Sequence, residues 1–101
     1  MILEVAQINI RAGEESGFEE TMQQALALLA GSKGFRGAKL FRSHEIGCRY
    51  HLQVFWDSIE NHMVDWQQSA AFKTWRGLLQ SYFAGVPSVE HMMLVRSQPE
   101  I

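Results

Sequence analysis

The feature that most constrains the fold is the order in which two kinds of hydrophobic spacing alternate along the chain. Runs rich in β-branched and aromatic residues are typical of strands, and apolar residues recurring every three or four positions are typical of helices. The expected strands span residues 2–10, 37–43, 48–56 and 88–96, and the expected helices span residues 14–30, 59–66 and 70–83. Counting the last two helices as one pair, the order is βαββαβ. This order predicts a ferredoxin-like α+β fold with an antiparallel sheet.

Residues that end or begin helices support these boundaries. Ser58 and Ser69 each precede a helical segment and can accept a hydrogen bond from a backbone N–H of the first turn. Gly85 and Pro87 follow the last helix, and proline cannot continue a helix. Residues 44–47 have a length suited to a hairpin between two of the strands.

The two faces of the predicted sheet differ. Because alternate side chains of a strand point to opposite faces, Tyr50, Leu52, Val54 and Trp56 share one apolar face, which we expect the helices to cover. The other face is expected to carry Leu3, Val5, Phe41, Phe55, Met92 and Leu94. An exposed apolar face needs a partner, so we expect a homodimer in which two sheets stack to form a barrel.

Length and charge limit the class of protein. With 101 residues the chain is long enough for one domain and too short for two, so we expect a domain over residues 1–96 and a tail over residues 97–101. The net charge of -2 does not suggest nucleic-acid binding, which requires a clustered excess of Lys and Arg. A local basic stretch, formed by Arg36, Lys39, Arg42 and Arg49, is interrupted by Glu45. We expect no nucleic-acid partner.

Cysteine content and hydropathy point to a cytoplasmic protein. The single Cys48 cannot form an internal disulfide, and no spacing of Cys and His resembles a zinc site. The first ten residues lack the basic region and the cleavage site of a signal peptide. No apolar run approaches the roughly 20 residues that a membrane helix needs. We therefore expect no membrane partner and no bound metal.

All three Trp residues of the chain lie within residues 56–75. Aromatic side chains bury a large area and offer flat faces to a planar ligand. Such a concentration indicates either a core seam or an aromatic-lined pocket. For Trp56, at a strand end, we expect a core position, whereas Trp66 and Trp75 are candidates for a pocket that binds a small aromatic molecule.

Several segments resemble the antibiotic biosynthesis monooxygenase family, a group of small dimeric α+β barrel proteins. They are MILEVAQINIRAGEESGFEE, RYHLQVFWDSIENH, and SAAFKTWRGLL followed by PSVEHM, and the likeness covers about residues 1–95. The resemblance implies one of the reactions found on such barrels. These are cofactor-independent oxygenation of polycyclic phenols, haem degradation and turnover of small signalling molecules.

The resemblance can be followed residue by residue. Members that oxidise anthrone-like polyphenols use a Trp on the second helix, an Asn one turn before it and a nearby Tyr. Trp66 matches that Trp, whereas His62, with Asn61 beside it, occupies the amide position, and Phe72 stands where the Tyr is expected. Haem-degrading relatives use an Asn on the first strand, for which Asn9 is available. Their haem-ligating His is absent from this chain, where Arg76 occupies that region.

An oxygenase that uses neither flavin nor metal needs a substrate that itself donates electrons to O2, which a phenol does once it is deprotonated. The site therefore needs a base and an apolar enclosure. Histidine suits this role because its unperturbed pKa lies near neutrality. We expect His62 and Trp66 to be catalytic, with His62 taking the proton. The expected substrate-binding residues are Asn9, His51, Gln53, Phe72 and Trp75.

Two alternatives remain open from the residues. The same barrel could bind a small molecule without catalysis, as a stress or signalling protein. It could also isomerise or break down a small phosphorylated or oxo metabolite, which would require an anion site near Arg49 or Arg76. Oxygen uptake with phenols and hydroquinones discriminates a monooxygenase from the non-catalytic binding protein.

Overall fold

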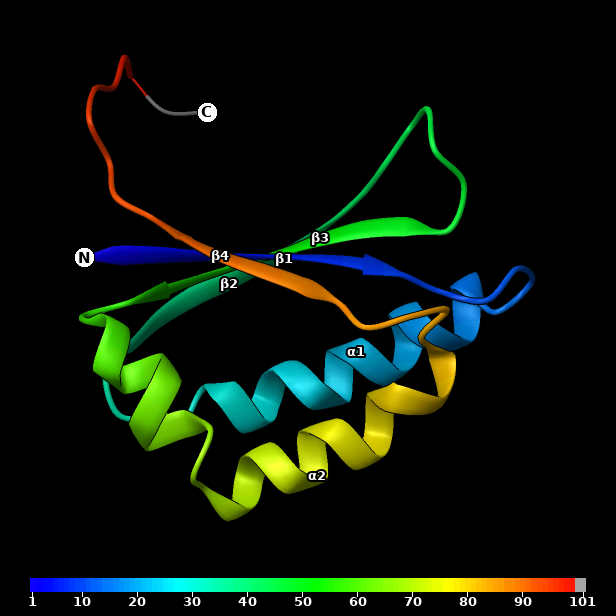
Figure 1. Ribbon diagram of the computed structural model, residues 1–101, viewed down its shortest axis with the longest axis horizontal. Coiled ribbons are helices and arrows are strands. Elements are labelled where there is room, and N and C mark those ends of the chain that lie inside the picture. Colours follow the sequence, from blue (N-terminus) through cyan, green and yellow to red (C-terminus); the bar gives the residue numbers. More distant parts are fainter. Residues whose placement is uncertain (100–101) are drawn as a thin grey trace.

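A four-stranded antiparallel sheet carries both helical segments on one face, in the computed structural model of the chain, which describes residues 1–99 (Figure 1). The strands lie in the order β2-β3-β1-β4. Their bounds are Ile2–Asn9 for β1, Phe35–Arg42 for β2, Arg49–Trp56 for β3 and Ser88–Met92 for β4. The expected ferredoxin-like α+β fold is confirmed.

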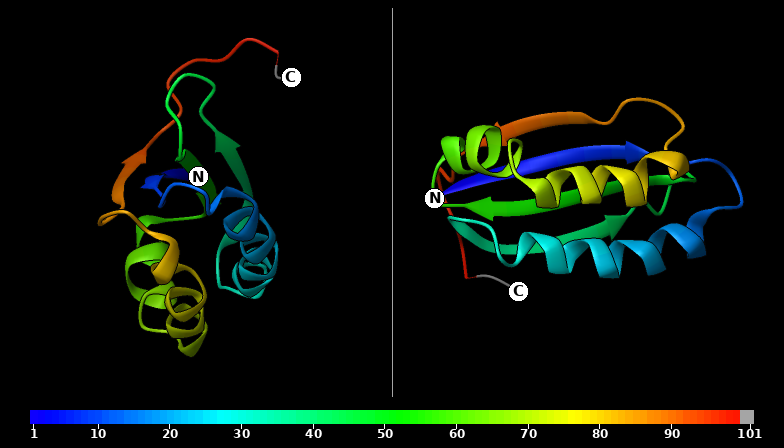
Figure 2. Two further views of the ribbon diagram at one scale, coloured as in Figure 1. Left: turned by 90° about the vertical axis from the view of Figure 1, so that its right-hand side faces the viewer. Right: turned by 90° about the horizontal axis from the view of Figure 1, so that it is seen from below.

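Helix α1 spans Glu15–Leu29, and α2 spans Ala70–Leu79. Between β3 and α2 lies a short π-helix, η1, over Asn61–Trp66, and a 3-10 turn, η2, extends α2 over Gln80–Tyr82. Figure 2 shows α1 and the η1–α2 segment side by side beneath the sheet. The β2–β3 loop and the segment after β4 project on the opposite side (Figure 2).

The core lies between the sheet and the helices, as the alternation along the strands predicts. Tyr50, Leu52, Val54 and Trp56 of β3 are all buried, which confirms the expected inner face. From α1, the buried side chains recur at helical spacing: Phe18, Met22, Ala25 and Leu29. Burying a side chain of the size of Phe18, Met22 or Leu29 contributes roughly 1.5–3 kcal/mol, so this layer supplies much of the stability of the fold.

Several bounds differ from those expected, and the structure departs most clearly in three elements. The helix expected over residues 59–66 is largely a π-helix, with the N–H of Gln67 donating to the carbonyl of His62 at 3.2 Å, five residues earlier. Strand β4 ends at Met92 instead of residue 96, because its pairing with β1 stops at Leu3. Strand β2 begins earlier, at Phe35, and a register shift near Gly37 accommodates the added residues.

Both serine caps are present. The hydroxyl oxygen of Ser69 accepts a hydrogen bond from the N–H of Phe72 at 3.1 Å, and that of Ser58 accepts from the N–H of Asn61 at 3.3 Å. Cys48, expected in a strand, lies just before β3 with a left-handed φ of 64°. The expected tail over residues 97–101 is described only as far as residue 99, and its last two residues lie outside the described part.

Candidate active site

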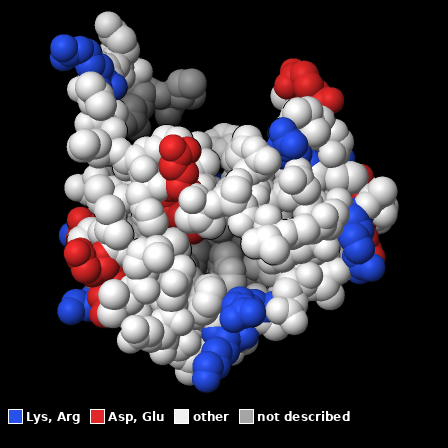
Figure 3. Space-filling model, viewed as in Figure 1, with Lys and Arg blue, Asp and Glu red and all other residues white. Residues whose placement is uncertain are grey.

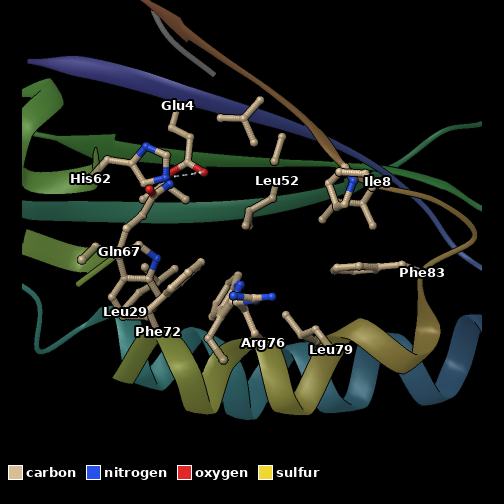
Figure 4. A pocket seen from close by; sticks show the side chains of 17 residues that line it. Glu4, Ile8, Leu29, Leu52, His62, Gln67, Phe72, Arg76, Leu79 and Phe83 are labelled. Atoms are coloured by element: carbon tan, nitrogen blue, oxygen red, sulfur yellow. Dashed lines mark ion pairs between the residues drawn. The ribbon is translucent and has the colours of Figure 1, made fainter. Parts of the chain in front are cut away.

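A cavity of about 350 Å³ lies between the sheet and the η1–α2 segment (Figure 4). It opens to the surface beside α2, where Figure 3 shows a hollow with Lys or Arg atoms at its lower edge. Its volume is within the range of small-molecule sites, about 300–1,000 Å³. Seventeen residues line it: Glu4, Ala6, Ile8, Leu29, Leu52, Val54, His62, Trp66, Gln67, Phe72, Trp75, Arg76, Leu79, Phe83, Val86, Pro87 and Val89.

The residues on the sheet side of the cavity are those that alternate strand positions direct toward the helices. Glu4, Ala6 and Ile8 of β1 point toward the helices, and so do Leu52 and Val54 of β3. The small side chain of Ala6 leaves space between its larger neighbours. This surface is apolar apart from Glu4, so one carboxyl group stands alone on an otherwise hydrophobic wall.

The helix side of the cavity is aromatic. The Trp66 ring meets Phe72 at a centroid distance of 5.6 Å and Trp75 at 5.7 Å, both edge to face. Trp66 is only 3% exposed, yet it borders the cavity. Edge-to-face packing fixes these rings relative to one another. The cavity therefore has a rigid aromatic wall beside Trp66.

Glu4 is held by a residue at the end of β3. The indole Nε1 of Trp56 donates a 2.9 Å hydrogen bond to Oε1 of Glu4. Glu4 is 7% exposed, and burial raises its pKa to about 6, although the hydrogen bond from Trp56 acts in the opposite direction. At neutral pH the carboxyl group is mostly ionised, and its pKa suits a group that accepts a proton from substrate.

His62 completes a polar cluster at the same end of the cavity (Figure 4). Its Nε2 lies 3.4 Å from Oε2 of Glu4, and its Nδ1 forms a 2.8 Å hydrogen bond with Nε2 of His91 on β4. The ring also stacks on Trp56 at a centroid distance of 5.7 Å. Burial, and secondarily the charge of His91, lowers the pKa of His62 to about 4. His62 is therefore neutral at physiological pH.

Asn61, beside the position where polyphenol-oxidising relatives carry an amide, does not line the cavity. The Oδ1 of Asn61 accepts hydrogen bonds from the backbone N–H of Ser58 at 3.1 Å and from the hydroxyl of Ser58 at 2.9 Å. The Nδ2 of Asn61 donates to Asp65 at 3.0 Å. Asn61 thus stabilises the start of η1. The residue that reaches the cavity from this turn is His62.

Four of the seven residues predicted for the site line the cavity together: His62, Trp66, Phe72 and Trp75. The other three lie elsewhere. Asn9 accepts a 3.0 Å hydrogen bond from Arg49 at the end of the sheet. His51 borders a separate hollow on the open face, and Gln53 alternates with the buried Leu52 and Val54. Since residues two apart share a face, both belong to the outer surface of the sheet.

The cavity residues that the sequence interpretation missed are chiefly Glu4 and Gln67. A signal for Glu4 was present, because it alternates in step with Ala6 and Ile8, which are buried. Within residues 1–99, no group of three or more His, Cys, Asp or Glu side chains is arranged to hold a metal ion. In the same part of the chain, no helix combines the length and the apolar character needed to cross a bilayer.

Known proteins share this fold and part of this sequence. A protein of Bordetella bronchiseptica assigned as an antibiotic biosynthesis monooxygenase is 42% identical, with a TM-score of 0.92 over 94% of this chain and 97% of that one. The cofactor-independent oxygenase SnoaB of Streptomyces nogalater is 16% identical, with a TM-score of 0.83 over 98% and 97% of the two chains. At that identity, SnoaB shares the fold alone.

A relative by sequence is the uncharacterized protein YczJ of Bacillus subtilis strain 168. It is 32% identical over 91 residues, which are 90% of this chain and 96% of the relative. The sequence profile described as antibiotic biosynthesis monooxygenase matches residues 1–78. The chain therefore belongs to the antibiotic biosynthesis monooxygenase family.

Proposed function

We propose that this protein is a cofactor-independent monooxygenase that oxidises a small, flat phenolic or anthrone-like molecule. The observation that carries the proposal is the Glu4–His62 pair, an ionisable pair buried at one end of an aromatic-walled cavity. A carboxylate in an apolar enclosure is a costly feature, since burial disfavours its charge. Such groups concentrate where proton transfer is needed. The description of SnoaB as a cofactor-independent oxygenase supports the same chemistry on this fold.

In this proposal Glu4, and not His62, is the base that accepts the proton of the substrate. The expectation from sequence was that His62 would take it, but the lowered pKa of His62 makes its protonated form unfavourable. The raised pKa of Glu4 makes the carboxylate the stronger base of the two. In this scheme, neutral His62 orients Glu4 from 3.4 Å, and Trp56 holds the other carboxylate oxygen.

The reaction proposed for an anthrone balances without an added reductant. Glu4 removes a proton from the methylene carbon, and the resulting carbanion, stabilised by the rings, passes one electron to O2. Superoxide and the substrate radical combine to form a C–O bond, and the peroxide takes up a proton. Loss of the second methylene proton then breaks the O–O bond, which leaves a ketone and releases water. One oxygen atom enters the product, and the substrate supplies all the electrons.

The cavity walls serve this scheme by binding and enclosure. Trp66, Phe72 and Trp75 offer ring surfaces to a flat substrate, and the amide of Gln67 is available for a hydrogen bond to a phenol or ketone oxygen. The apolar side chains of the sheet exclude water from the carbanion and the peroxide. Asn9, His51 and Gln53 take no part in this proposal.

A homodimer formed through the open face of the sheet is also proposed. That face carries Leu3, Val5 and Phe55, together with the exposed Phe41 and Met92. Burying apolar surface of this kind is the driving force for stable association. Stacking two such faces would give the expected α+β barrel. Each subunit would retain its own cavity, because the cavity lies on the helix side.

Oxygen consumption tests the proposed function. The purified protein, treated with a chelator and free of flavin absorbance, is mixed with anthrones, naphthols and hydroquinones in an oxygen electrode. The expected result is uptake of one O2 per ketone or quinone formed, well above the rate without protein. Binding of these compounds without uptake would instead support a non-catalytic binding protein.

A further inference from the structure

Arg76 is an ionisable residue of the cavity that the proposed chemistry does not use. Among the lining residues described, three have ionisable side chains, Glu4, His62 and Arg76. Only Arg76 carries a permanent positive charge. It comes from α2, whereas Glu4 comes from β1 on the opposite wall (Figure 4). The cavity therefore has a negative group on the sheet side and a positive group on the helix side.

The guanidinium of Arg76 has no carboxylate within 4 Å among residues 1–99. Other arginines of the chain do have such partners: Arg11 pairs with Glu14, Arg36 with Asp57, and Arg42 with Glu19. Arg49 and Arg96 also lack a carboxylate partner among residues 1–99, so what sets Arg76 apart is that it lines the cavity.

The position of Arg76 is defined by an aromatic contact. Its guanidinium carbon lies 5.9 Å from the centroid of the Phe72 ring, one turn earlier on α2. Arg76 is exposed to solvent, so it lines the cavity at its open side, and in Figure 4 its guanidinium lies between α2 and the sheet. It also borders the adjoining hollow formed with Gln80, Phe83 and Pro87. Contact with a ring face restrains the plane of a guanidinium and leaves its N–H edges free to bind an oxyanion.

We infer that the ligand of this cavity is an aromatic acid whose carboxylate binds Arg76. The planar fork of a guanidinium matches the two oxygens of a carboxylate. Repulsion by Glu4 disfavours the reverse orientation, so the acid group faces Arg76 and the reacting carbon faces Glu4. The inference rests on the cavity being the ligand site of the proposed function, and it does not depend on oxygenation.

Calorimetric titration of the full chain with 2-naphthoate and with 2-naphthamide tests the inference. The two ligands have the same ring and nearly the same shape, and they differ in charge. The wild type is expected to bind the naphthoate about threefold to fivefold more tightly than the amide, as one charged contact at an exposed site allows. This preference should weaken as salt is added.

Variants at position 76 distinguish a direct contact between Arg76 and the ligand carboxylate from the general effect of positive charge on the protein. Arg76→Gln should abolish the preference by weakening naphthoate binding alone, and Arg76→Lys should retain part of it. Lys73→Gln is the matched control, because Lys73 is an exposed cation on the same helix that does not line the cavity. It should leave both affinities unchanged.

Equal affinities in the wild type, a preference that survives Arg76→Gln, or binding of neither ligand would each overturn the inference. The first two results leave the proposed oxygenation intact. Conversely, a preference that Arg76→Gln removes, in a protein that consumes no oxygen with any phenol, supports the acid site and counts against oxygenation.

Discussion

The indole N–H of Trp56 and the carboxylate of Glu4 are joined by a 2.9 Å hydrogen bond inside the core. Trp56 ends β3 and Glu4 lies in β1, and their strands are neighbours in the sheet. The bond fixes one carboxylate oxygen and leaves the other 3.4 Å from His62. A tryptophan that is entirely buried thereby orients the ionisable group of the cavity.

Replacement of Glu4 by Gln tests the proposed base. The amide oxygen of Gln can still accept the Trp56 hydrogen bond, but an amide cannot take a proton from substrate. Turnover of any substrate found in the oxygen assay should fall about 100-fold or more. The oligomeric state and the affinity for a non-reacting aromatic ligand should stay unchanged. Turnover within threefold of the wild type would remove Glu4 as the base.

The stability of the same variant should depend on pH in a defined way. The pKa of Glu4 is raised from 4.5 to about 6 in the folded chain. Its contribution to stability is therefore fully present below pH 4.5 and is lost as the pH rises through 6, with a cost of about 2 kcal/mol. Relative to the wild type, Glu4→Gln should gain about 2 kcal/mol between pH 4.5 and pH 8 in urea unfolding. A pH-independent difference would mean that Glu4 titrates normally.

The pH dependence of kcat/KM should report the same group. Only the ionised carboxylate can act as a base, so kcat/KM should rise with pH and level off above the Glu4 pKa of about 6. His62, with its pKa lowered to about 4, should add no inflection between pH 5 and pH 8. Initial rates across this range check the prediction, and an inflection that persists in Glu4→Gln would assign the titration to another residue.

The strands and the core were predictable because they depend on local periodicity. Alternation along residues 50–56 identified the buried face of β3, and Ser69 identified the start of α2. The π-helix could not be predicted, since one extra residue in a turn changes the hydrophobic pattern of a six-residue segment very little. The π-helical form of η1 is nonetheless important, because this segment carries His62 and Trp66.

The site was predicted in part for a similar reason. Trp66 and Phe72 were found through aromatic clustering and family position, both of which are properties of one segment. Glu4 was missed because a carboxylate on an inward face is unfavourable until Trp56 and His62 are brought beside it by the fold. Gln53, in contrast, was assigned to the site for its polarity, although its strand position directs it to the outer face.

Trp66→Phe tests whether the ring at position 66 contacts the ligand. The smaller ring should weaken binding of a flat aromatic several-fold and cost about 1–3 kcal/mol of stability. Phe18→Leu is the control, because Phe18 is buried against Tyr50 and Tyr82 and does not line the cavity. It should lose similar stability with no change in affinity. Equal effects of both variants on binding would mean that Trp66 is only a core residue.

Gly34 is expected to control the placement of η1. It has a left-handed φ of +78°, and an added Cβ would overlap the side chain of Asn61. Gly34→Ala should therefore cost about 3 kcal/mol, from backbone strain and lost hydrogen bonds to Ser58. Gly31→Ala should cost under about 0.5 kcal/mol, because no atom lies within 4 Å of its Cβ position. Chemical denaturation of both variants provides the comparison, and equal stabilities would contradict it.

A matched pair of methionines tests the proposed dimer. Met92 lies on the open face of the sheet and is 43% exposed, whereas Met63 lies on η1 and is 44% exposed. Met92→Asp places charge in the proposed interface and should yield monomers in light scattering, because an unpaired charge is costly to bury. Met63→Asp should leave the dimer intact. A wild-type monomer at micromolar concentration would count against the interface altogether.

The most direct test of the proposed reaction is oxidation of an anthrone-type substrate under ¹⁸O2, followed by mass spectrometry of the ketone. The wild type should introduce one ¹⁸O atom per product molecule in a protein-dependent reaction, and Glu4→Gln should lose that labelling rate. Product labelled from water, or an equal rate of labelling by Glu4→Gln, would contradict proton removal by Glu4 as the step that opens the substrate to oxygen.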